Sequence, residues 1–312
     1  MRILKPKALR KGDIVAIVAP ASPPASEEKL EKGIRYLEQN GYRVILGKNL
    51  HRKRGYLAGT DKERASDLNE LFANKSVKAI FCARGGYGAS RILSLLDYQL
   101  IRSNPKILVG YSDITALHLA LFTKSGITSF SGPMVSVEMS GELKGNAEEF
   151  FWRALTSVKP LKAVTSKKRE WIMAKTPRPT TGRLIGGNLS LVTALAGTPY
   201  FKPPERAILF FEEIDERPYR IDRMLRQLML SSAFKTSRGV VLGNFSGCDP
   251  DPGKPSLTLR QVFEDTFQDY PSPVVSGIHA GHVKGSLTLP IGVNVRLNGT
   301  GGSVKFLESG VS

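Results

Sequence analysis

The first 135 residues alternate short apolar runs with segments of helical periodicity, and this alternation constrains the fold more than any other feature. The runs are rich in β-branched residues, whereas the segments between them carry apolar residues three or four positions apart. Such alternation predicts a mostly parallel α/β sheet, with helices covering both faces because the runs are apolar throughout. The expected strands are 15–20, 42–46, 77–83, 107–110 and 127–130, and the expected helices are 27–40, 61–73, 89–96 and 114–123.

A second α/β pattern follows a stretch rich in Lys, Thr and Pro that lacks periodicity. We therefore expect an N-terminal α/β domain over 1–158, a linker over 159–180 and a C-terminal α/β domain over 181–312. Two domains are also what a chain of 312 residues predicts. The expected strands of the second domain are 182–185, 207–211, 240–245 and 274–278, and its expected helices begin at 189 and span 219–230 and 257–267.

The chain is strongly basic, with 45 Lys and Arg against 28 Asp and Glu and a formal net charge of +17. Such a charge raises the question of nucleic-acid binding. The basic residues, however, are spread along the chain, with short clusters only at 51–54 and 167–169, and no zinc-finger or RNA-recognition signature is present. We interpret the charge as a basic solvated surface.

The two cysteines, Cys82 and Cys248, have no CxxC partner, and neither predicts a disulfide framework or a zinc site. No apolar run approaches the roughly 20 residues that span a bilayer. The basic N-terminus before the apolar stretch 14–21 resembles a signal peptide superficially. We interpret this stretch as the first core strand, and we expect a cytoplasmic protein without a membrane partner.

Ser112 directly follows the apolar run 107–110 and precedes a helical segment. A sharp turn between strand and helix would expose its hydroxyl at the carboxyl end of the sheet, as in a nucleophile elbow. The second glycine of the usual G-x-S-x-G pattern is replaced by Ile114. A serine at this position is also typical of a helix N-cap, so the motif alone leaves both interpretations open.

The loop Arg84–Gly88 (Arg-Gly-Gly-Tyr-Gly) likewise lies between a strand and a helix. Its glycines allow a backbone to approach a ligand closely, and its N–H groups can stabilise an oxyanion. It matches neither the dinucleotide-binding nor the phosphate-loop pattern. An oxyanion-hole contribution and a plain tight turn both remain open at this point.

A serine nucleophile needs a base, which in turn is oriented by a third group. His279 and His282 follow an apolar strand, in a loop from which a histidine can reach a cleft, although a structural role is also open to them. Glu212 and Glu213 end the apolar run 208–211, where a carboxylate costs desolvation free energy unless it has a partner. A histidine is a suitable partner for such a carboxylate, and Arg217 or Arg220 is an equally plausible one. The remaining histidines have other expected roles: His51 is expected to be solvated and His118 to be packed or on the surface.

Taken together, these segments resemble the bacterial LD-carboxypeptidase family, which also contains the microcin C self-immunity peptidases. The matching motifs occur in order along almost the whole chain. They are LRKGDIVAIVAP at 9–20, GTDKERASDL at 59–68, ARGGYG at 83–88, GYSDIT at 110–115, GGNL at 186–189, FEEI at 211–214 leading into YRIDRML at 219–225, Gly281-His282, and LPIG at 289–292.

The resemblance implies a catalytic triad of Ser112, Glu212 and His282, with Glu212 ranked above Glu213 and His282 above His279. It also implies an oxyanion hole made by main-chain N–H groups, for which we expect Asp113 and Gly86, with Gly85 as the alternative glycine. The expected fold is a mostly parallel N-terminal sheet of the flavodoxin or glutamine-amidotransferase kind, plus a second α/β domain. No metal or cofactor is implied.

The same resemblance implies a cytoplasmic, homodimeric serine carboxypeptidase that releases the terminal D-alanine from murein tetrapeptides during peptidoglycan recycling. Within hydrolases, the alternative is a microcin-immunity-type peptidase that cuts peptidyl-nucleotide conjugates; the linker around Trp171 is short for a nucleotide-recognition loop, which favours murein. Outside enzymes, the alternative is a basic nucleic-acid or ligand-binding protein. No residue in the sequence distinguishes lysine from diaminopimelate in the substrate.

Overall fold

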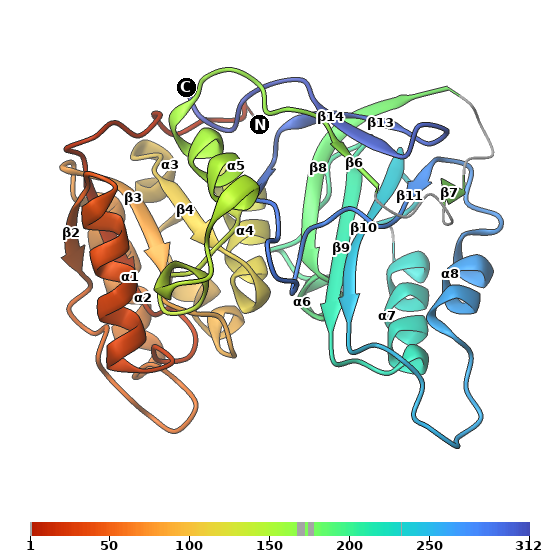
Figure 1. Cartoon of the computed structure of the whole chain (residues 1–312), viewed down its shortest axis with the longest axis horizontal. Helices are drawn as coiled ribbons and strands as arrows, with labels where there is room; N and C mark the ends of the chain where they lie inside the picture. The colour runs from red at the N-terminus through yellow and green to blue at the C-terminus, as the bar shows by residue number, and fades with distance from the viewer. Residues whose placement is uncertain (1, 167–171, 174–177, 232) are drawn as a thin grey trace. The chain divides into compact units, whose positions relative to one another are not determined.

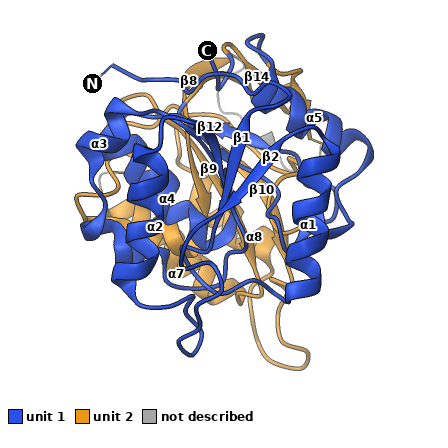
Figure 2. Cartoon of the chain, turned by 90° about the vertical axis from the view of Figure 1, so that its left-hand side faces the viewer, with its two compact units in different colours: residues 1–160, 284–292, 309–312 blue, residues 161–283, 293–308 orange. Residues whose placement is uncertain are grey.

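The computed structural model describes residues 2–166, 172–173, 178–231 and 233–312. The chain divides into two compact units, described separately below (Figure 1, Figure 2). Unit 1 contains Met1–Pro160, Lys284–Gly292 and Ser309–Ser312, and unit 2 contains Leu161–Val283 and Val293–Glu308. The contiguous domains expected from the sequence therefore differ from these units, because two short C-terminal segments belong to unit 1.

Unit 1 is built on a six-stranded sheet with the order β12-β5-β4-β3-β1-β2. The five strands from the N-terminal half are parallel, and β12 pairs antiparallel with β5 at the edge. The parallel strands have the flavodoxin-like order 2-1-3-4-5, so the predicted parallel α/β fold is confirmed. The strands are β1 (Ile14–Val18), β2 (Arg43–Leu46), β3 (Val77–Cys82), β4 (Ile107–Gly110), β5 (Ser129–Ser131) and β12 (Leu289–Ile291).

The strand order places three loops at the carboxyl edge of this sheet. The chain runs from β1 outward to β2 and returns to β3, so the direction of winding reverses between β1 and β3. In open α/β sheets, ligands bind at such a reversal, outside the carboxyl ends of the strands. The loops after β1, β3 and β4 end up there, and the last two contain Arg84–Gly88 and Ser112.

Helices α1 and α2 begin at residues whose side chains cap them. Ser26 accepts a hydrogen bond from the Lys29 N–H at the start of α1, and Thr60 and Glu63 form a capping box at the start of α2. The α-helices are α1 (Glu27–Gln39), α2 (Asp61–Ala73), α3 (Tyr98–Ser103), α4 (Thr115–Ala120) and α5 (Gly145–Thr156).

Three features of unit 1 differ from expectation. The predicted helix 89–96 is a 3₁₀-helix, η1 (Ala89–Leu95), and the predicted helix 114–123 is divided into α4 and a π-helical turn, η3 (Leu121–Ser125). Helices α3 and α5 were not expected. α3 is only six residues long, too short for a periodic pattern, and the N-cap position of α5 is Lys144, which makes no side-chain capping bond.

Unit 2 is built on an eight-stranded mixed sheet with the order β6-β14-β13-β8-β9-β10-β11-β7. Its centre, β8-β9-β10-β11, is parallel, and antiparallel strands flank it on both sides. The strands are β6 (Val164–Thr165), β7 (Ile172–Met173), β8 (Thr180–Asn188), β9 (Ile208–Ile214), β10 (Gly239–Ser246), β11 (Val274–Val275), β13 (Asn294–Asn298) and β14 (Ser303–Phe306).

Three helices connect the parallel strands of unit 2: α6 (Leu189–Leu195), α7 (Pro218–Leu230) and α8 (Leu259–Phe267). They coincide closely with the predicted helices. The C-terminal strands β12, β13 and β14 were not expected, since they are three to five residues long. Within the expected linker, β6 and β7 are edge strands, and residues 167–171 and 174–177 lie outside the described residues.

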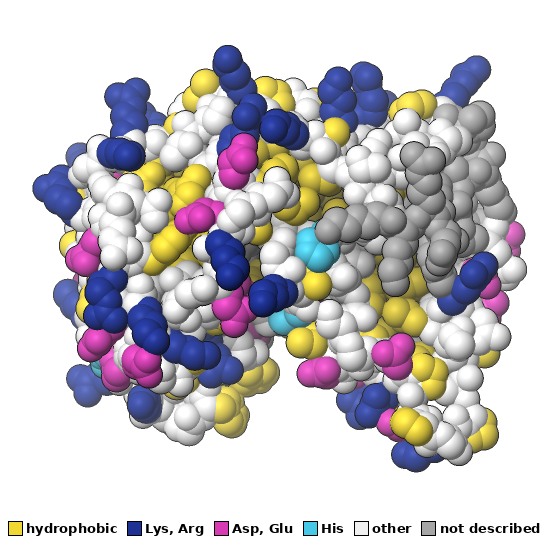
Figure 3. All heavy atoms as spheres, in the orientation of Figure 1, with side chains coloured by type: hydrophobic (Ala, Val, Ile, Leu, Met, Phe, Trp, Pro, Cys, Tyr) yellow, Lys and Arg dark blue, Asp and Glu magenta, His cyan; other side chains and the backbone are white. Residues whose placement is uncertain are grey.

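Figure 3 shows one face of the molecule, on which dark blue Lys and Arg side chains outnumber magenta Asp and Glu side chains. This agrees with the formal charge of +17. None of the helices described for this chain is long and apolar enough to cross a membrane.

Candidate active site

Ser112 occupies a strained turn at the carboxyl end of β4. Its backbone φ is +63°, in the left-handed region that non-glycine residues rarely adopt. The strand ends at Gly110, and a short 3₁₀-helix, η2 (Ser112–Ile114), leads directly into α4. The side chain is partly exposed. This is the sharp strand-to-helix turn that a nucleophile elbow requires.

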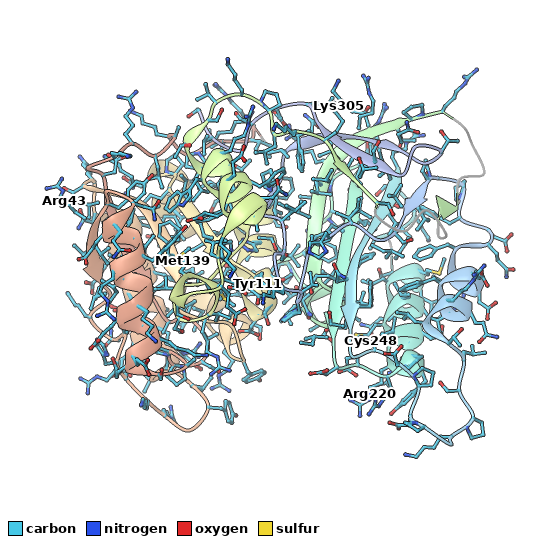
Figure 4. The ribbon with its side chains drawn as sticks, viewed as in Figure 1. Arg43, Tyr111, Met139, Arg220, Cys248 and Lys305 are labelled. Carbon is cyan, nitrogen blue, oxygen red and sulfur yellow. The ribbon has the colours of Figure 1, made fainter. Side chains whose placement is uncertain are left out.

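The alternative that Ser112 is a helix N-cap does not hold. The residues at the N-cap positions of η2 and α4 are Tyr111 and Ile114, and neither helix start receives a side-chain hydrogen bond. Tyr111 instead turns its side chain toward the segment containing Met139, and its hydroxyl donates to Glu138 Oε1 at 2.6 Å (Figure 4). The Ser112 hydroxyl therefore does not cap the start of either helix.

The side chain of His118 hydrogen bonds to the backbone at the start of this turn. It is fully buried on α4, where its Nε2 hydrogen bonds to the Gly110 carbonyl at 2.8 Å and its Nδ1 to Ser129 Oγ at 2.9 Å. Because a carbonyl can only accept, Nε2 carries the proton and Nδ1 accepts from the serine. Burial lowers the pKa of His118 to about 4, so the ring is neutral at physiological pH. Of the two roles left open for His118, packed or on the surface, the structure shows the packed one.

The side chain of Asp113 joins the Ser112 turn to the glycine-rich loop. The carboxylate is almost fully buried, and its Oδ2 accepts a hydrogen bond from the Ala89 N–H at 2.7 Å, just after Gly88. Burial raises the pKa of Asp113 to about 6, and the hydrogen bonds from the loop backbone and the nearby Arg64 partly oppose this rise. The sequence predicted a role for the main-chain N–H of Asp113 but not this one for its side chain.

The glycine-rich loop lies directly against Ser112. A Cβ atom added to Gly85 would be 2.9 Å from Ser112 Cβ and 3.1 Å from its Oγ, so only a residue without a side chain fits there. Ser22, from the loop after β1, holds the other side: its N–H donates to the Gly85 carbonyl at 3.2 Å, and its Oγ accepts from the Tyr87 N–H at 3.2 Å. The backbone around Gly86 is thus fixed near the serine.

In unit 2, Glu212 and His282 form a hydrogen-bonded pair. His282 Nδ1 lies 2.7 Å from Glu212 Oε2, and the same oxygen accepts from the His282 main-chain N–H at 3.1 Å. The carboxylate is only 2% exposed and the imidazole 13%. An ionised carboxylate can only accept, so the hydrogen bond places the proton on Nδ1 and leaves Nε2 as the basic nitrogen of the ring.

The turn that carries His282 is shaped around this pair. Gly281 has a φ of +111°, and a Cβ atom there would lie 2.5 Å from Glu212 Oε2. Two hydrogen bonds fix the turn to β10: the Asn244 N–H donates to the Ala280 carbonyl at 2.8 Å, and the Ser246 side-chain Oγ donates to the His282 carbonyl at 2.6 Å. The histidine is therefore held in one orientation.

The neighbouring candidates have other roles. Successive strand residues point to opposite faces, and Glu213 faces α6, where its carboxylate accepts hydrogen bonds from Asn188 Nδ2 and from the N–H and Oγ of Ser190. Burial raises the pKa of Glu213. His279 lines a cavity of about 320 Å³, which residues of β10 and α8 also line. The carboxylate–imidazole hydrogen bond that the structure shows joins Glu212 to His282.

The arginines proposed as alternative partners are also occupied elsewhere. Arg217 contacts Asp251 at 2.7 Å, and Arg220 contacts Glu216 at 3.4 Å. Of the expected site residues, the structure brings Ser112, Asp113, Gly85 and Gly86 together within unit 1, and Glu212 and His282 together within unit 2.

Two residues that support the site were missed by the sequence analysis. Ser22 fixes the glycine-rich loop as described above, and Arg64 on α2, almost fully buried, donates hydrogen bonds to the carbonyls of Pro20 and Gly88. A signal existed for Arg64, since it lies on the face of α2 that also carries Leu68 and Leu71. A charged residue at a buried helix position requires a set of acceptors nearby.

Residues 15–132 match the model of the LD-carboxypeptidase N-terminal domain, and residues 181–297 match that of the LD-carboxypeptidase C-terminal domain. The chain belongs to the LD-carboxypeptidase family. It is a serine carboxypeptidase with the two-domain α/β fold of that family, as the sequence motifs predicted.

Three relatives illustrate the range of this LD-carboxypeptidase family. The probable murein peptide carboxypeptidase of Bacillus subtilis strain 168 is 40% identical, over 99% of this chain and 95% of its own length. The crystal structure of muramoyltetrapeptide carboxypeptidase from Oxalobacter formigenes is 31% identical with a TM-score of 0.83, covering 94% of this chain and 97% of that one. The Microcin C7 self-immunity protein MccF of Escherichia coli is 28% identical, over 97% of this chain and 96% of its own length.

Gly281→Ala is expected to separate Glu212 from His282, because the new Cβ would overlap the carboxylate. The downfield proton signal of His282 Nδ1–H should disappear from the NMR spectrum, and the protein should lose about 1–3 kcal/mol of stability. Gly197→Ala is the matched control: Gly197 also has a positive φ, +86°, but a Cβ there meets nothing within 4 Å. An unchanged Nδ1–H signal in Gly281→Ala would contradict the tight pairing.

His118 is expected to destabilise the fold on acidification. Its native pKa of about 4 lies below the ordinary value of about 6.5, so the unfolded chain binds more protons between these pH values. Stability should therefore be complete above pH 6.5 and fall by up to about 3 kcal/mol as the pH falls toward 4. NMR titration of the histidines, with urea unfolding at each pH, tests this. Titration of His118 near pH 6.5 would refute this prediction.

Proposed function

We propose that this carboxypeptidase releases the terminal D-alanine from murein tetrapeptides, with Ser112 as nucleophile, His282 as general base and Glu212 as the group that orients the histidine. The Glu212–His282 hydrogen bond is the observation that carries this proposal most directly. A buried carboxylate on Nδ1 is the arrangement that makes Nε2 an effective base for a hydroxyl. The partly exposed Ser112 on its strained turn is the matching nucleophile.

The proposed reaction is acyl transfer in two steps. Nε2 of His282 takes the proton of the Ser112 hydroxyl as Oγ attacks the carbonyl carbon of the scissile bond, and the same proton then passes to the nitrogen of the leaving D-alanine. The resulting acyl-enzyme is hydrolysed by water, which His282 deprotonates in the same way. Glu212 stays ionised and stabilises the imidazolium that forms in each step.

The oxyanion that forms in each step is proposed to bind the main-chain N–H groups of Asp113 and Gly86. The contact of Gly85 with Ser112, together with the fixed position of the loop through Ser22 and Asp113, supports this assignment. Fixed main-chain donors contribute strongly to such reactions because they need no reorganisation as charge develops. The choice of Gly86 over Gly85 remains a prediction.

Murein tetrapeptides carry several carboxylates, and a chain of charge +17 attracts such anions over a distance of roughly a Debye length, about 8 Å at physiological salt. The names of the Bacillus and Oxalobacter relatives agree with this substrate class. We place the reaction in cytoplasmic peptidoglycan recycling and propose a homodimer. Light scattering on the purified protein tests the oligomeric state.

One observation favours a second candidate, a peptidase for peptidyl-nucleotide conjugates. MccF in complex with glutamyl sulfamoyl guanosine matches this chain with a TM-score of 0.87 at 26% identity, over 99% of this chain and 100% of that one. Trp171, in the linker whose shortness favoured murein, lies outside the described residues. Turnover of a murein tetrapeptide and of a peptidyl sulfamoyl adenosine analogue, followed by mass spectrometry, compares the two. Preference for the nucleotide conjugate would reject the murein proposal.

Ser112→Ala is expected to reduce D-alanine release from a murein tetrapeptide by at least about 10³-fold, since the nucleophile is removed while the backbone donors remain. The measurement is mass spectrometry of the digest, with circular dichroism to confirm the fold. Release at the wild-type rate would show that another residue is the nucleophile.

The two adjacent glutamates offer a matched pair of variants. Glu212→Gln should lower kcat by about 10²-fold or more, because the amide no longer stabilises the charged imidazole. Glu213→Gln removes one negative charge at the next residue but faces α6, so it should affect stability while kcat stays within about threefold of wild type. Equal losses of kcat in both variants would contradict the proposed role of Glu212.

A further inference from the structure

A cavity of about 300 Å³ lies at the amino ends of β3 and β4 in unit 1. Five lysines line it, and the described lining contains no Asp or Glu. Its remaining lining residues are Val77, Asn104, Pro105 and Ser312, and a carboxylate at Ser312 would still leave an excess of positive charge. The lining lysines are Lys5, Lys7, Lys75, Lys78 and Lys106.

This cavity is separate from the site described above. Lys106 directly precedes β4, whereas Ser112 follows its other end. A strand of four residues spans about 13 Å at roughly 3.3 Å per residue, so the cavity lies at the amino edge of the sheet and the serine at the carboxyl edge. Neither the family comparison nor the proposed reaction assigns a role to the amino edge.

Lys106 is the unusual member of this group, because its side chain is buried, with only 5% exposed. Its Nζ donates hydrogen bonds to the carbonyls of Asn74 and Val77, both at 2.7 Å. An ammonium group has three N–H donors. The third has no acceptor among the residues that the structure describes, although Lys106 borders the cavity.

Lys78 adds a second positive charge close to Lys106. Burial first, and then the charge of Lys78, lower the pKa of Lys106 to about 8. The Nζ of Lys78 donates a hydrogen bond to the Lys75 carbonyl at 3.0 Å. Like charges held near each other in a partly desolvated cavity repel, and an anion placed between them would turn this repulsion into attraction.

We propose that this lysine-lined cavity is a binding site for a small ligand that carries a phosphate or diphosphate group. Several ammonium groups around one concavity match the charge of a phosphate, which lysine binds as a point charge. The volume is at the lower end of the range for small-ligand pockets, about 300–1,000 Å³. A nucleic-acid duplex would instead need phosphate contacts spread along an extended surface.

Isothermal titration calorimetry with sodium pyrophosphate at constant ionic strength tests the proposal. The wild-type protein should bind one pyrophosphate per chain saturably, and Ser112→Ala should bind it equally well because the carboxyl edge is not involved. Lys75→Ala/Lys78→Ala should weaken binding by at least about tenfold, since each lysine supplies a charge-assisted contact. Lys75 and Lys78 are exposed, so their removal should leave the fold intact, which circular dichroism checks.

Lys29→Ala/Lys62→Ala removes the same charge from exposed positions on α1 and α2 outside the cavity, and binding should stay within about twofold of wild type. Equal weakening in both double variants would show non-specific attraction and overturn the proposal. So would the absence of saturable binding below 10 mM pyrophosphate, taken as roughly the weakest useful affinity. Duplex DNA that binds through Lys75 and Lys78 while pyrophosphate does not would overturn it as well.

Discussion

The buried carboxylate of Asp113 holds together the turns at the carboxyl edge of the unit 1 sheet. Desolvation makes this position costly for a negative charge, as the raised pKa shows, and the main-chain hydrogen bond from Ala89 offsets part of that cost. The same hydrogen bond fixes the loop after β3 against the turn after β4. The hydrogen bonds of Asp113 to Ala89 and of His118 to Gly110 fix the residues on either side of the strained backbone of Ser112, as such a conformation requires.

Unit 2 uses two adjacent carboxylates in opposite ways. Glu213 faces one side of the sheet, where its carboxylate accepts hydrogen bonds at the start of α6 and so stabilises the fold. Glu212 faces the other side, where its partner is an imidazole. The period of two along a strand is what separates these roles. A one-residue shift of β9 that brought Phe211 into the place of Glu212 would leave His282 without a carboxylate, so strand register is a condition for the proposed chemistry.

Much of this architecture was predictable because it depends on local patterns. The parallel strands of unit 1 are apolar runs between capped helices, and the Thr60–Glu63 capping box can be recognised from two residues. The triad candidates were identified through motifs. What could not be predicted rests on distant contacts: Ser22 against Gly85, Arg64 against Pro20, and the pairing of β12 with β5. Short strands such as β12 carry too few residues for a periodic signal, and only the partner strand defines them.

The return of the C-terminal segments to unit 1 has a consequence for synthesis. The β5 edge is covered by residues 289–291, and Thr128 donates to the Gly310 carbonyl. Unit 1 therefore cannot complete its interior contacts until the last residues of the chain have been synthesised. A ribosome adding roughly 5–20 residues per second needs about ten seconds or more to supply them. During that time the nascent unit 1 exposes an unpaired strand edge. Loss of the C-terminal residues should therefore damage unit 1, because the β5 edge and Thr128 would lose their partners.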